Sequence, residues 1–444
     1  MKVARLPFDP GPAAWNALLP PAPASTPLEG KRNADVVVIG AGFAGLSAAR
    51  RLNQLDRTLD IVVLEARRVA EGPGGRNSGF MIDLPHHLAS KDYAGQRESD
   101  RQQTAMNREA IRFAAEAVEE LGMSEEAFTI SGKINAAATA KGVTHNEVYA
   151  RHLEDMGEDF ELLDADAMRA VCGSSYYQSG LYTPGTAMLQ PALYLRNLAN
   201  GLVDQGVDIF ENSPVTAMAS NGDHWLVETP KGRLRVGNVI LATNGHVESF
   251  GHFKRRLMHV YLYASMTRAL STDERRQLGG EQRWGFTPAD PMGTTVRRMS
   301  GTGGDRIVVR NGFTWSPSRS VAQDRHETFA KSHDRSFVER FPQLAHVDMD
   351  YRWGGLLCLS WNAVPAFGEI DDGLYAACCQ NGLGTAMGTL SGKLIAEHVM
   401  GRTSPSLDTM LSYPPPKQLP PEPFATIGAN AKMRWGEWRA GREK

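Results

Sequence analysis

The feature that most constrains the fold is the stretch VVVIGAGFAGLSAARRLNQLDRTLDIVVLEARR, which begins at Val36. It reads as a buried strand, a turn with Gly40, Gly42 and Gly45 in the spacing GxGxxG, a helix with one apolar face, and a second strand that ends at Glu65. A lone GxGxxG is a weak signal, but here every flanking element is present in the right order. The stretch therefore predicts a βαβ unit that binds a dinucleotide.

Each glycine of this turn has a separate expected function. Gly40 permits the tight turn, Gly42 lets the backbone approach a pyrophosphate, and Gly45 lets the helix pack closely on the strand. The turn also contains Phe43 and Ala44. The helix that begins here points its N-terminal N–H groups and partial positive charge at the phosphates.

Glu65 lies 20 residues after the last glycine, where a carboxylate can accept hydrogen bonds from a ribose 2′-hydroxyl. An acid at this position argues against a 2′-phosphate. Ala66 and Arg67 follow it and are expected beside the same ribose. Both NAD and FAD use such a unit, so the βαβ stretch alone leaves the nucleotide open.

Length and composition limit the remaining possibilities. A chain of 444 residues is expected to form two domains, and a formal charge of -2 gives no electrostatic basis for binding nucleic acid. Small molecules are the expected partners. The four cysteines show no metal-ligand spacing and predict reduced thiols, as in the cytoplasm, and no run of 18 apolar residues predicts a transmembrane segment.

The periodicity of apolar residues predicts further elements along the chain. Helices are expected at 101–121, 142–157 and 191–206, and a hairpin is expected around the turn SGTGGD at 300–305. A last strand and helix are expected within 373–401. The middle of the chain looks antiparallel, whereas both ends look like βα units.

Three further stretches carry a resemblance to a known family. EGPGGRNSGFM at 71–81 resembles a glycine-rich GRN loop, VILATNGH at 239–246 a strand and turn near the cofactor, and WGGLLCLSWNAVPAFGEIDDGLYAACCQNGLGTAMG at 353–388 a closing strand, turn and helix. With the βαβ unit they resemble the FAD-dependent amine and amino-acid oxidase (D-amino-acid oxidase-like) superfamily. The γ-glutamylputrescine oxidase branch is the most similar, and the resemblance spans about residues 30–402.

The resemblance implies a cofactor and the residues that hold it. The cofactor is FAD, bound non-covalently, because the residues around Cys358 do not match the attachment site of sarcosine oxidases. The chain departs from the family pattern at Cys379, where glycine is usual, and at Leu383, where histidine is frequent. The expected FAD contacts are Gly40, Gly42, Phe43, Ala44, Gly45, Glu65, Ala66, Arg67, Gly75, Arg76, Asn77, Ser78, Val215, Ala242, Thr243, Asn244, Trp353, Gly382, Leu383, Gly384 and Thr385.

The expected fold class is α/β, with a Rossmann-type FAD-binding domain and a second mixed-sheet (α+β) substrate domain, both discontinuous in sequence. The expected segments are an extended N-terminal arm at 1–29, the FAD-binding domain at 30–90, 187–250 and 352–402, the substrate domain at 91–186 and 251–351, and a Pro-rich tail at 403–444.

The implied activity is oxidation of the C–N bond of a small amine or amino acid. A hydride equivalent moves to flavin N5, and the resulting imine hydrolyses to a carbonyl. O2 is the expected acceptor. A dehydrogenase that passes electrons to a quinone or carrier, and a non-catalytic FAD-binding subunit of a complex, remain alternatives. A hydroxylase using NAD(P)H is disfavoured, because no second GxGxxG followed by an acid is present.

Substrate contacts are expected from the middle strands. His259, Tyr261 and Tyr263 come from the run HVYLY, and Arg297, by its resemblance to the family's tyrosine-arginine strand, could clamp a substrate carboxylate with two parallel bonds. A solvated Arg297 and a structural His259 are the alternatives. Trp353 and Trp361 are expected to wall the flavin.

Overall fold

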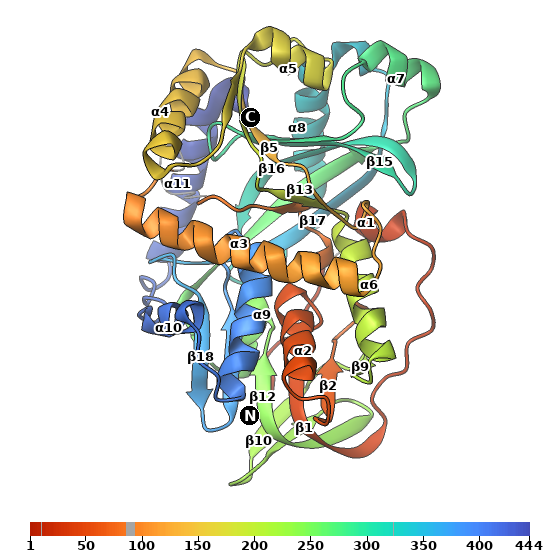
Figure 1. The fold of residues 1–444 in the computed structure, drawn as a ribbon, viewed down its shortest axis with the longest axis vertical. Helices are drawn as coiled ribbons and strands as arrows, with labels where there is room; N and C mark the ends of the chain where they lie inside the picture. Colours follow the sequence, from red (N-terminus) through yellow and green to blue (C-terminus); the bar gives the residue numbers. More distant parts are fainter. Residues whose placement is uncertain (10, 86–93, 323) are drawn as a thin grey trace.

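The computed structural model describes residues 1–9, 11–85, 94–322 and 324–444. Two lobes are stacked along the long axis of the molecule: one surrounds β1 and β12, the other surrounds β13 and β17, and the long helix α3 crosses between them (Figure 1). Residues 86–90, at the end of one predicted FAD-binding segment, lie outside the described residues.

The first lobe is built on a mainly parallel sheet. Its strand order is β10-β11-β12-β1-β2-β9, with β19 also paired to β12 and β18 paired to β19. Val38 lies opposite Val63 on one side and Ile240 on the other, both in parallel register. The strands are β1 (Gly30–Ile39), β2 (Ile61–Leu64), β9 (Asp208–Phe210), β10 (Ala217–Ser220), β11 (Trp225–Glu228), β12 (Gly232–Leu241), β18 (Ala366–Asp371) and β19 (Leu374–Cys378).

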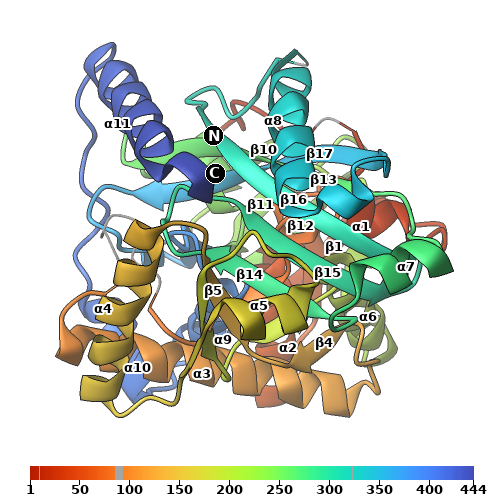
Figure 2. The same ribbon diagram turned by 90° about the horizontal axis from the view of Figure 1, so that it is seen from above.

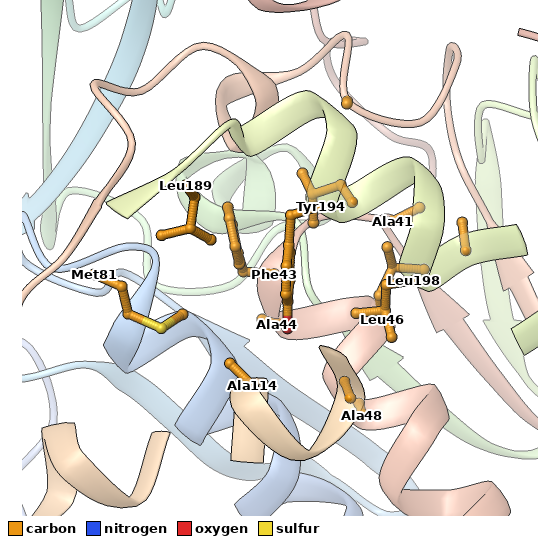
Figure 3. Close-up of a cluster of buried hydrophobic side chains, with 14 of the residues drawn as sticks. Ala41, Phe43, Ala44, Leu46, Ala48, Met81, Ala114, Leu189, Tyr194 and Leu198 are labelled. Atoms are coloured by element: carbon orange, nitrogen blue, oxygen red, sulfur yellow. The ribbon is translucent and has the colours of Figure 1, made fainter. Parts of the chain in front are cut away.

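Helices α2 (Phe43–Leu55), α6 (Pro191–Asp204) and α9 (Ala386–Val399) cover one face of this sheet. Leu46 of α2 and Leu390 of α9 are completely buried in the core that they share. Phe43 stacks on Tyr194 of α6 with ring centroids 5.7 Å apart (Figure 3). Packing thus fixes the position of the first turn of α2. The strands are buried on both faces, so the apolar stripe of the helix must face the sheet.

The second lobe is built on a mixed sheet of order β17-β13-β16-β15-β14-β5-β7-β6. Every neighbouring pair is antiparallel except β5 and β14. The strands are β5 (Lys133–Ala137), β6 (Glu161–Leu163), β7 (Ser179–Thr183), β13 (Leu257–Thr267), β14 (Trp284–Pro288), β15 (Thr295–Gly301), β16 (Gly304–Trp315) and β17 (Met349–Ser360). A small sheet of β3 (Phe80–Met81), β8 (Ala187–Leu189) and β4 (Phe128–Ile130) joins the lobes.

Side chains of α5 and α8 cover one face of the mixed sheet, where Met168 and Phe337 pack on Ile134 and Phe286. The opposite face, which carries Thr287, is turned toward the first lobe. The remaining helices are α1 (Ala14–Ala17), α3 (Arg97–Glu120), α4 (Ala140–Met156), α5 (Ala165–Cys172), α7 (Thr272–Leu278), α8 (Asp324–Arg340), α10 (Pro405–Ser412) and α11 (Phe424–Ala440), with the 3-10 turns η1 (Pro73–Gly75), η2 (Asn244–Phe250), η3 (Pro342–Leu344) and η4 (Gly441–Glu443).

Most elements predicted from periodicity are present. The helices expected at 101–121, 142–157 and 191–206 correspond to α3, α4 and α6, and the SGTGGD turn joins β15 to β16. The Pro-rich tail differs from the simple expectation, because it contains α10 and α11. The arm at 1–29 is mainly extended but contains the short helix α1.

Three chemical features of the described residues bear on function. No helix among them is long and apolar enough to cross a membrane. No group of three or more His, Cys, Asp or Glu side chains in the same part of the chain is arranged to hold a metal ion. The four cysteines are all buried and form no disulfide.

Candidate active site

A large cavity lies where the two lobes meet. It encloses about 340 Å³ and is walled by the turns that follow β1, β2 and β12, by loop 72–78, and by one face of the mixed sheet. Of the residues predicted to contact the cofactor, all except Gly45 and Gly75 line it. Those on the wall are Gly40, Gly42, Phe43, Ala44, Glu65, Ala66, Arg67, Arg76, Asn77, Ser78, Val215, Ala242, Thr243, Asn244, Trp353, Gly382, Leu383, Gly384 and Thr385.

The glycine-rich turn has the geometry that its spacing predicts. Gly40 has a φ of +106°, and a Cβ there would lie 2.7 Å from the carbonyl oxygen of Ala242. A Cβ on Gly45 would lie 1.7 Å from the carbonyl oxygen of Gly40, so this glycine allows helix and strand to pack. A Cβ on Gly42 would have nothing within 4 Å beyond its chain neighbours. The backbone at Gly42 is therefore open to the cavity.

Glu65, directly after β2, is anchored to the same turn. Its Oε2 accepts the N–H of Ala41 at 2.9 Å, and its Oε1 accepts the N–H of Arg67 at 3.1 Å. Burial raises the pKa of Glu65, while these two N–H groups and the Arg67 charge oppose the rise. Each carboxylate oxygen can accept a further bond, so both remain able to receive a ribose hydroxyl.

The GRN loop is held rigidly against the second lobe. Arg76 donates to the carbonyl oxygens of Glu71 at 2.7 Å and Gly354 at 3.0 Å, and its own carbonyl oxygen accepts Trp353 Nε1–H at 3.0 Å. A Cβ on Gly75 would lie 1.9 Å from a backbone oxygen of the same loop. Gly75 thus serves packing, and Arg76 orients the loop, whereas Asn77 and Ser78 face the cavity.

The carboxyl end of β12 supplies a further wall. The N–H of Ala242 donates to the carbonyl oxygen of Ile39 at 2.9 Å, which brings this end beside the glycine-rich turn. Asn244 has a φ of 46°, and its side-chain oxygen Oδ1 is buried with no hydrogen-bond partner among the described residues. A buried acceptor without a partner is costly in a folded protein, so Asn244 points to a ligand that donates to it.

The turn before α9 closes the other end of the cavity. Gly382 has a φ of +95°, and a Cβ on Gly384 would meet nothing within 4 Å. The side chain of Thr385 does not cap α9, because its hydroxyl donates to the carbonyl oxygen of Phe80 at 2.6 Å. The helix N-terminus is therefore placed to stabilise negative charge in the cavity.

Two predicted substrate residues, His259 and Tyr261, lie outside the cavity wall. His259 Nε2 is 2.7 Å from Glu248 Oε2, and Glu248 also binds Arg319 at 3.1 Å. Tyr261 is completely buried, and burial raises the pKa of its hydroxyl. The Tyr263 ring stacks on Phe329 of α8 with centroids 4.2 Å apart, and its hydroxyl donates to Thr314 Oγ1 at 2.9 Å, so this side chain is directed toward α8.

Arg297, the predicted carboxylate clamp, is also absent from the cavity wall. Its guanidinium is buried and donates to the carbonyl oxygens of Ser78, Gly79 and Leu189, at 3.2, 3.3 and 2.5 Å. It also lies 5.4 Å from the ring of Trp15. Burial lowers the pKa of Arg297 to about 10. The structure gives this residue the task of joining β15 to the GRN loop.

The mixed sheet presents a different arginine, Arg310, to the cavity, where Arg297 was expected. Arg310 pairs with Ala264 of β13 and Thr295 of β15, and all three line the cavity. Thr287 lines the same region. Arg310 and Arg297 lie on the same face of the sheet, because Arg310 alternates with Val308 along β16 and Val308 pairs with Arg297. Tertiary packing decides which end of that face meets the cavity.

A buried lysine stands one residue behind this wall. Lys133 Nζ donates to Asn135 Oδ1 at 2.5 Å, and the cavity-lining Thr287 donates to the same oxygen at 2.6 Å. Burial lowers the pKa of Lys133 to about 8, and the charge of Asp83 opposes the shift. The sequence carries no signal for a buried Lys133, since a lysine inside a short strand normally indicates a solvated position.

The N-terminal arm covers the nucleotide end of the cavity. Val3, Arg5, Leu6, Pro7 and Asp9 line it. Farther along the arm, Trp15 is completely buried, packs edge-on against Trp353 with ring centroids 6.2 Å apart, and donates from Nε1 to the carbonyl oxygen of Asn77 at 2.8 Å. The arm therefore belongs to the site, which a proline-rich, low-periodicity sequence does not indicate.

These observations fit FAD. The open backbone at Gly42 and the buried, unpartnered acceptor of Asn244 both lie on the cavity wall, where a ligand would meet them. One cavity connects Glu65 after β2, the glycine-rich turn after β1 and the turn at Gly384 before α9.

Comparisons with known proteins agree with this geometry. Residues 35–398 match the family model described as "DAO: FAD dependent oxidoreductase". A "Probable oxidoreductase OrdL" of Haemophilus influenzae is 28% identical over 84% of this chain and 85% of its own length. The "Gamma-glutamylputrescine oxidoreductase" of Escherichia coli is 27% identical over 83% and 84%. The solved glycine oxidase from Geobacillus kaustophilus shares the fold, with a TM-score of 0.70 at 15% identity over 88% of this chain and 100% of that one.

Proposed function

The chain belongs to the family of FAD dependent oxidoreductases, and on that premise we propose that it oxidises the C–N bond of a small amine or amino acid. The observation that carries the proposal is the shared cavity: the dinucleotide-binding turn and the polar face of the mixed sheet line one continuous space. The relative named gamma-glutamylputrescine oxidoreductase, which aligns over 84% of its own length, supports this substrate class.

The residues around Gly42 and Glu65 would hold the pyrophosphate and ribose, and Asn244 and Gly384 the rest of the cofactor. We assign these contacts to a discontinuous FAD-binding domain of 30–90, 187–250 and 352–402. Bound FAD would supply a two-electron acceptor for the hydride of the carbon beside the substrate nitrogen. The N-terminus of α9 would stabilise the negative charge that this transfer creates.

The mixed sheet would bind the substrate. Arg310 is the cation that the mixed sheet contributes to the cavity wall, and it would pair with a substrate carboxylate. Phe80 and Ile82, which also line the cavity, would exclude water from the reacting carbon. The reactive substrate is the neutral amine, since hydride transfer needs the nitrogen lone pair, so the rate of flavin reduction should rise with pH until the bound amine is deprotonated.

The test is anaerobic reduction of the flavin. Purified holoprotein is mixed with a panel of amines, D- and L-amino acids and γ-glutamylated amines, and separately with NADH and NADPH, while the visible flavin band is followed. Bleaching by an amine or amino acid, and not by a nicotinamide, is the expected result. Bleaching by a nicotinamide alone would favour a hydroxylase or reductase, and a band that no compound bleaches would favour a structural flavin.

We propose O2 as the electron acceptor. Reoxidation of the bleached protein by air should occur at least as fast as turnover. If reoxidation by air is slow and a soluble quinone restores the band quickly, the protein is a dehydrogenase, and the oxidase part of the proposal fails while the substrate part stands.

A further inference from the structure

Helix α11 exposes a row of large apolar side chains. Phe424, Ile427, Trp435 and Trp438 are 68%, 61%, 62% and 72% exposed. At 3.6 residues per turn these four positions fall within a sector of roughly 80° around the helix axis. The rings of Trp435 and Trp438 lie with centroids 5.0 Å apart. The row, here called the aromatic stripe, is a continuous apolar face on the surface of the molecule.

The aromatic stripe is not the face by which α11 attaches to the protein. Ala425, Ala429 and Met433, on the other side of the helix, pack on the apolar cluster of β13, β16 and β17. Trp315 Nε1 donates to Thr426 Oγ1 at 2.9 Å. The helix is thus already docked, and Figure 2 shows it at the outer edge of the molecule. Large exposed apolar patches on a docked element indicate a binding surface.

Cations flank the aromatic stripe on both sides. Lys432 and Arg439 lie on one side of it by helical spacing, Arg434 lies on the other, and all three are exposed. Glu437 is the sole acidic residue between 424 and 440. It is turned inward, accepting the N–H of Phe313 at 3.3 Å and pairing with Lys444 at 2.9 Å. The exposed side of α11 therefore carries positive charge alone.

We propose that α11 docks the protein on the surface of an anionic phospholipid bilayer. A helix that lies in the membrane interface typically has Trp and Phe on the buried side and Lys or Arg beside them, because tryptophan favours the headgroup boundary and the cations pair with anionic lipids. With 17 residues, α11 would lie along the surface. A second copy of the chain fits poorly, since a two-fold contact would bring the cations of both helices together with no acid between them.

The experiment measures vesicle binding by the FAD-loaded full chain. The protein is sedimented with vesicles of phosphatidylcholine containing 30% phosphatidylglycerol, and with vesicles of phosphatidylcholine alone. Binding to the anionic vesicles should exceed binding to the neutral ones by about tenfold or more and should weaken several-fold as the salt is raised, because the exposed cations pair with anionic headgroups and salt screens that attraction. Tryptophan emission should shift to shorter wavelength on binding.

Matched variants distinguish binding through the aromatic stripe from non-specific adsorption to vesicles. The double variant Trp435→Ala/Trp438→Ala should lose binding to the anionic vesicles, and Lys432→Glu/Arg434→Glu should lose the preference for anionic lipid. Trp361, which was expected to wall the flavin, is instead 64% exposed and absent from the cavity wall. Trp361→Ala therefore removes an exposed tryptophan outside α11 and should bind like the wild type. Circular dichroism and the visible flavin band confirm that each variant is folded.

Two results would overturn the proposal. One is wild-type binding by the folded double tryptophan variant. The other is wild-type protein that binds neither kind of vesicle. In that case light scattering tests whether the stripe instead joins two copies of the chain, which would make the wild type a dimer and the double tryptophan variant a monomer. Neither result depends on flavin reduction, so the proposed function is tested separately.

Discussion

At the scale of single residues, two arginines on one sheet have opposite tasks. Arg297 is enclosed by three backbone carbonyl oxygens, whereas Arg310 stands on the wall of the cavity. Sequence position could not distinguish them, since both lie in antiparallel strands of the substrate lobe. The difference is that Arg297 contacts the GRN loop. That contact joins residues more than two hundred positions apart in the sequence, so it cannot be seen in the sequence.

The two arginines give a paired prediction. Arg310→Met should raise the KM for carboxylate-bearing substrates about tenfold to a hundredfold, from the loss of about 1.5–3 kcal/mol of charge-assisted bonding, with little change for simple alkylamines. Arg297→Met should instead lower the melting temperature, because three carbonyl oxygens around the guanidinium each lose a donor. Steady-state kinetics and thermal melts check both. Equal KM values for wild type and Arg310→Met would remove Arg310 from the substrate site.

Lys133 predicts a pH dependence of stability. Its pKa falls from 10.5 to about 8 in the folded protein. Between those pH values the unfolded chain binds a proton that the folded chain lacks, so the free energy of unfolding should rise with pH across this window. Below about pH 8 both states are protonated, and the cost of burying the ammonium group is present in full.

Lys133→Met should therefore stabilise the protein at pH 7 and flatten the rise in melting temperature from pH 8 to 10. Asp83, the charged group that opposes the shift, is itself paired with Arg108 at 3.2 Å and stays unchanged in the variant. The exposed pair of Lys231 and Glu29 gives the control Lys231→Met, which should shift stability by less than about 0.5 kcal/mol. Melts over this pH range make the comparison, and a variant less stable than wild type at pH 7 would contradict the assigned cost.

At the scale of elements, the turn between β1 and α2 contains one glycine that we assign to FAD binding, Gly42, and another that we assign to folding, Gly45. Gly42→Ala places a methyl group where no protein atom lies within 4 Å, at a φ of -89° that alanine adopts without strain. The apoprotein should melt like the wild type but bind FAD more weakly. Gly45→Ala would force a methyl group to 1.7 Å from a carbonyl oxygen and should destabilise the apoprotein itself. Calorimetry of the apoproteins and FAD titration test this, and unaltered FAD affinity in Gly42→Ala would contradict the assignment.

The elements also show how far sequence reasoning reaches. Gly40, Gly42 and Glu65 could be placed from spacing because strand, turn and helix are consecutive in the chain. Arg310 could not be chosen over its neighbours, since the docking of distant segments decides which strand residues reach the cavity. Helix α11 escaped prediction because both of its faces carry apolar residues, which removes the amphipathic signal.

At the scale of the whole molecule, the N-terminal arm closes the site that the two lobes build. Asp9 is buried beside Arg67 at 3.4 Å, and residues 3–9 form part of the cavity wall. Deletion of residues 2–9 should leave the fold intact, because Trp15 and α1 remain, and should speed FAD dissociation. Flavin release into a desalting column or to an apoflavodoxin trap measures the rate. A deletion variant that keeps the wild-type dissociation rate would show that the arm covers the site without retaining the cofactor.

The discontinuous first lobe also orders events during synthesis. Strand β1 is complete at Ile39, but its neighbour β12 begins at Gly232, and the last wall of the cavity, at Gly382, follows much later. With ribosomes adding about 5–20 residues per second, β1 waits roughly 10–40 s for that neighbour. The nascent chain cannot enclose its cofactor during this interval. FAD must therefore bind after most of the chain has been synthesised. A cell short of flavin would accumulate full-length protein whose cavity is open.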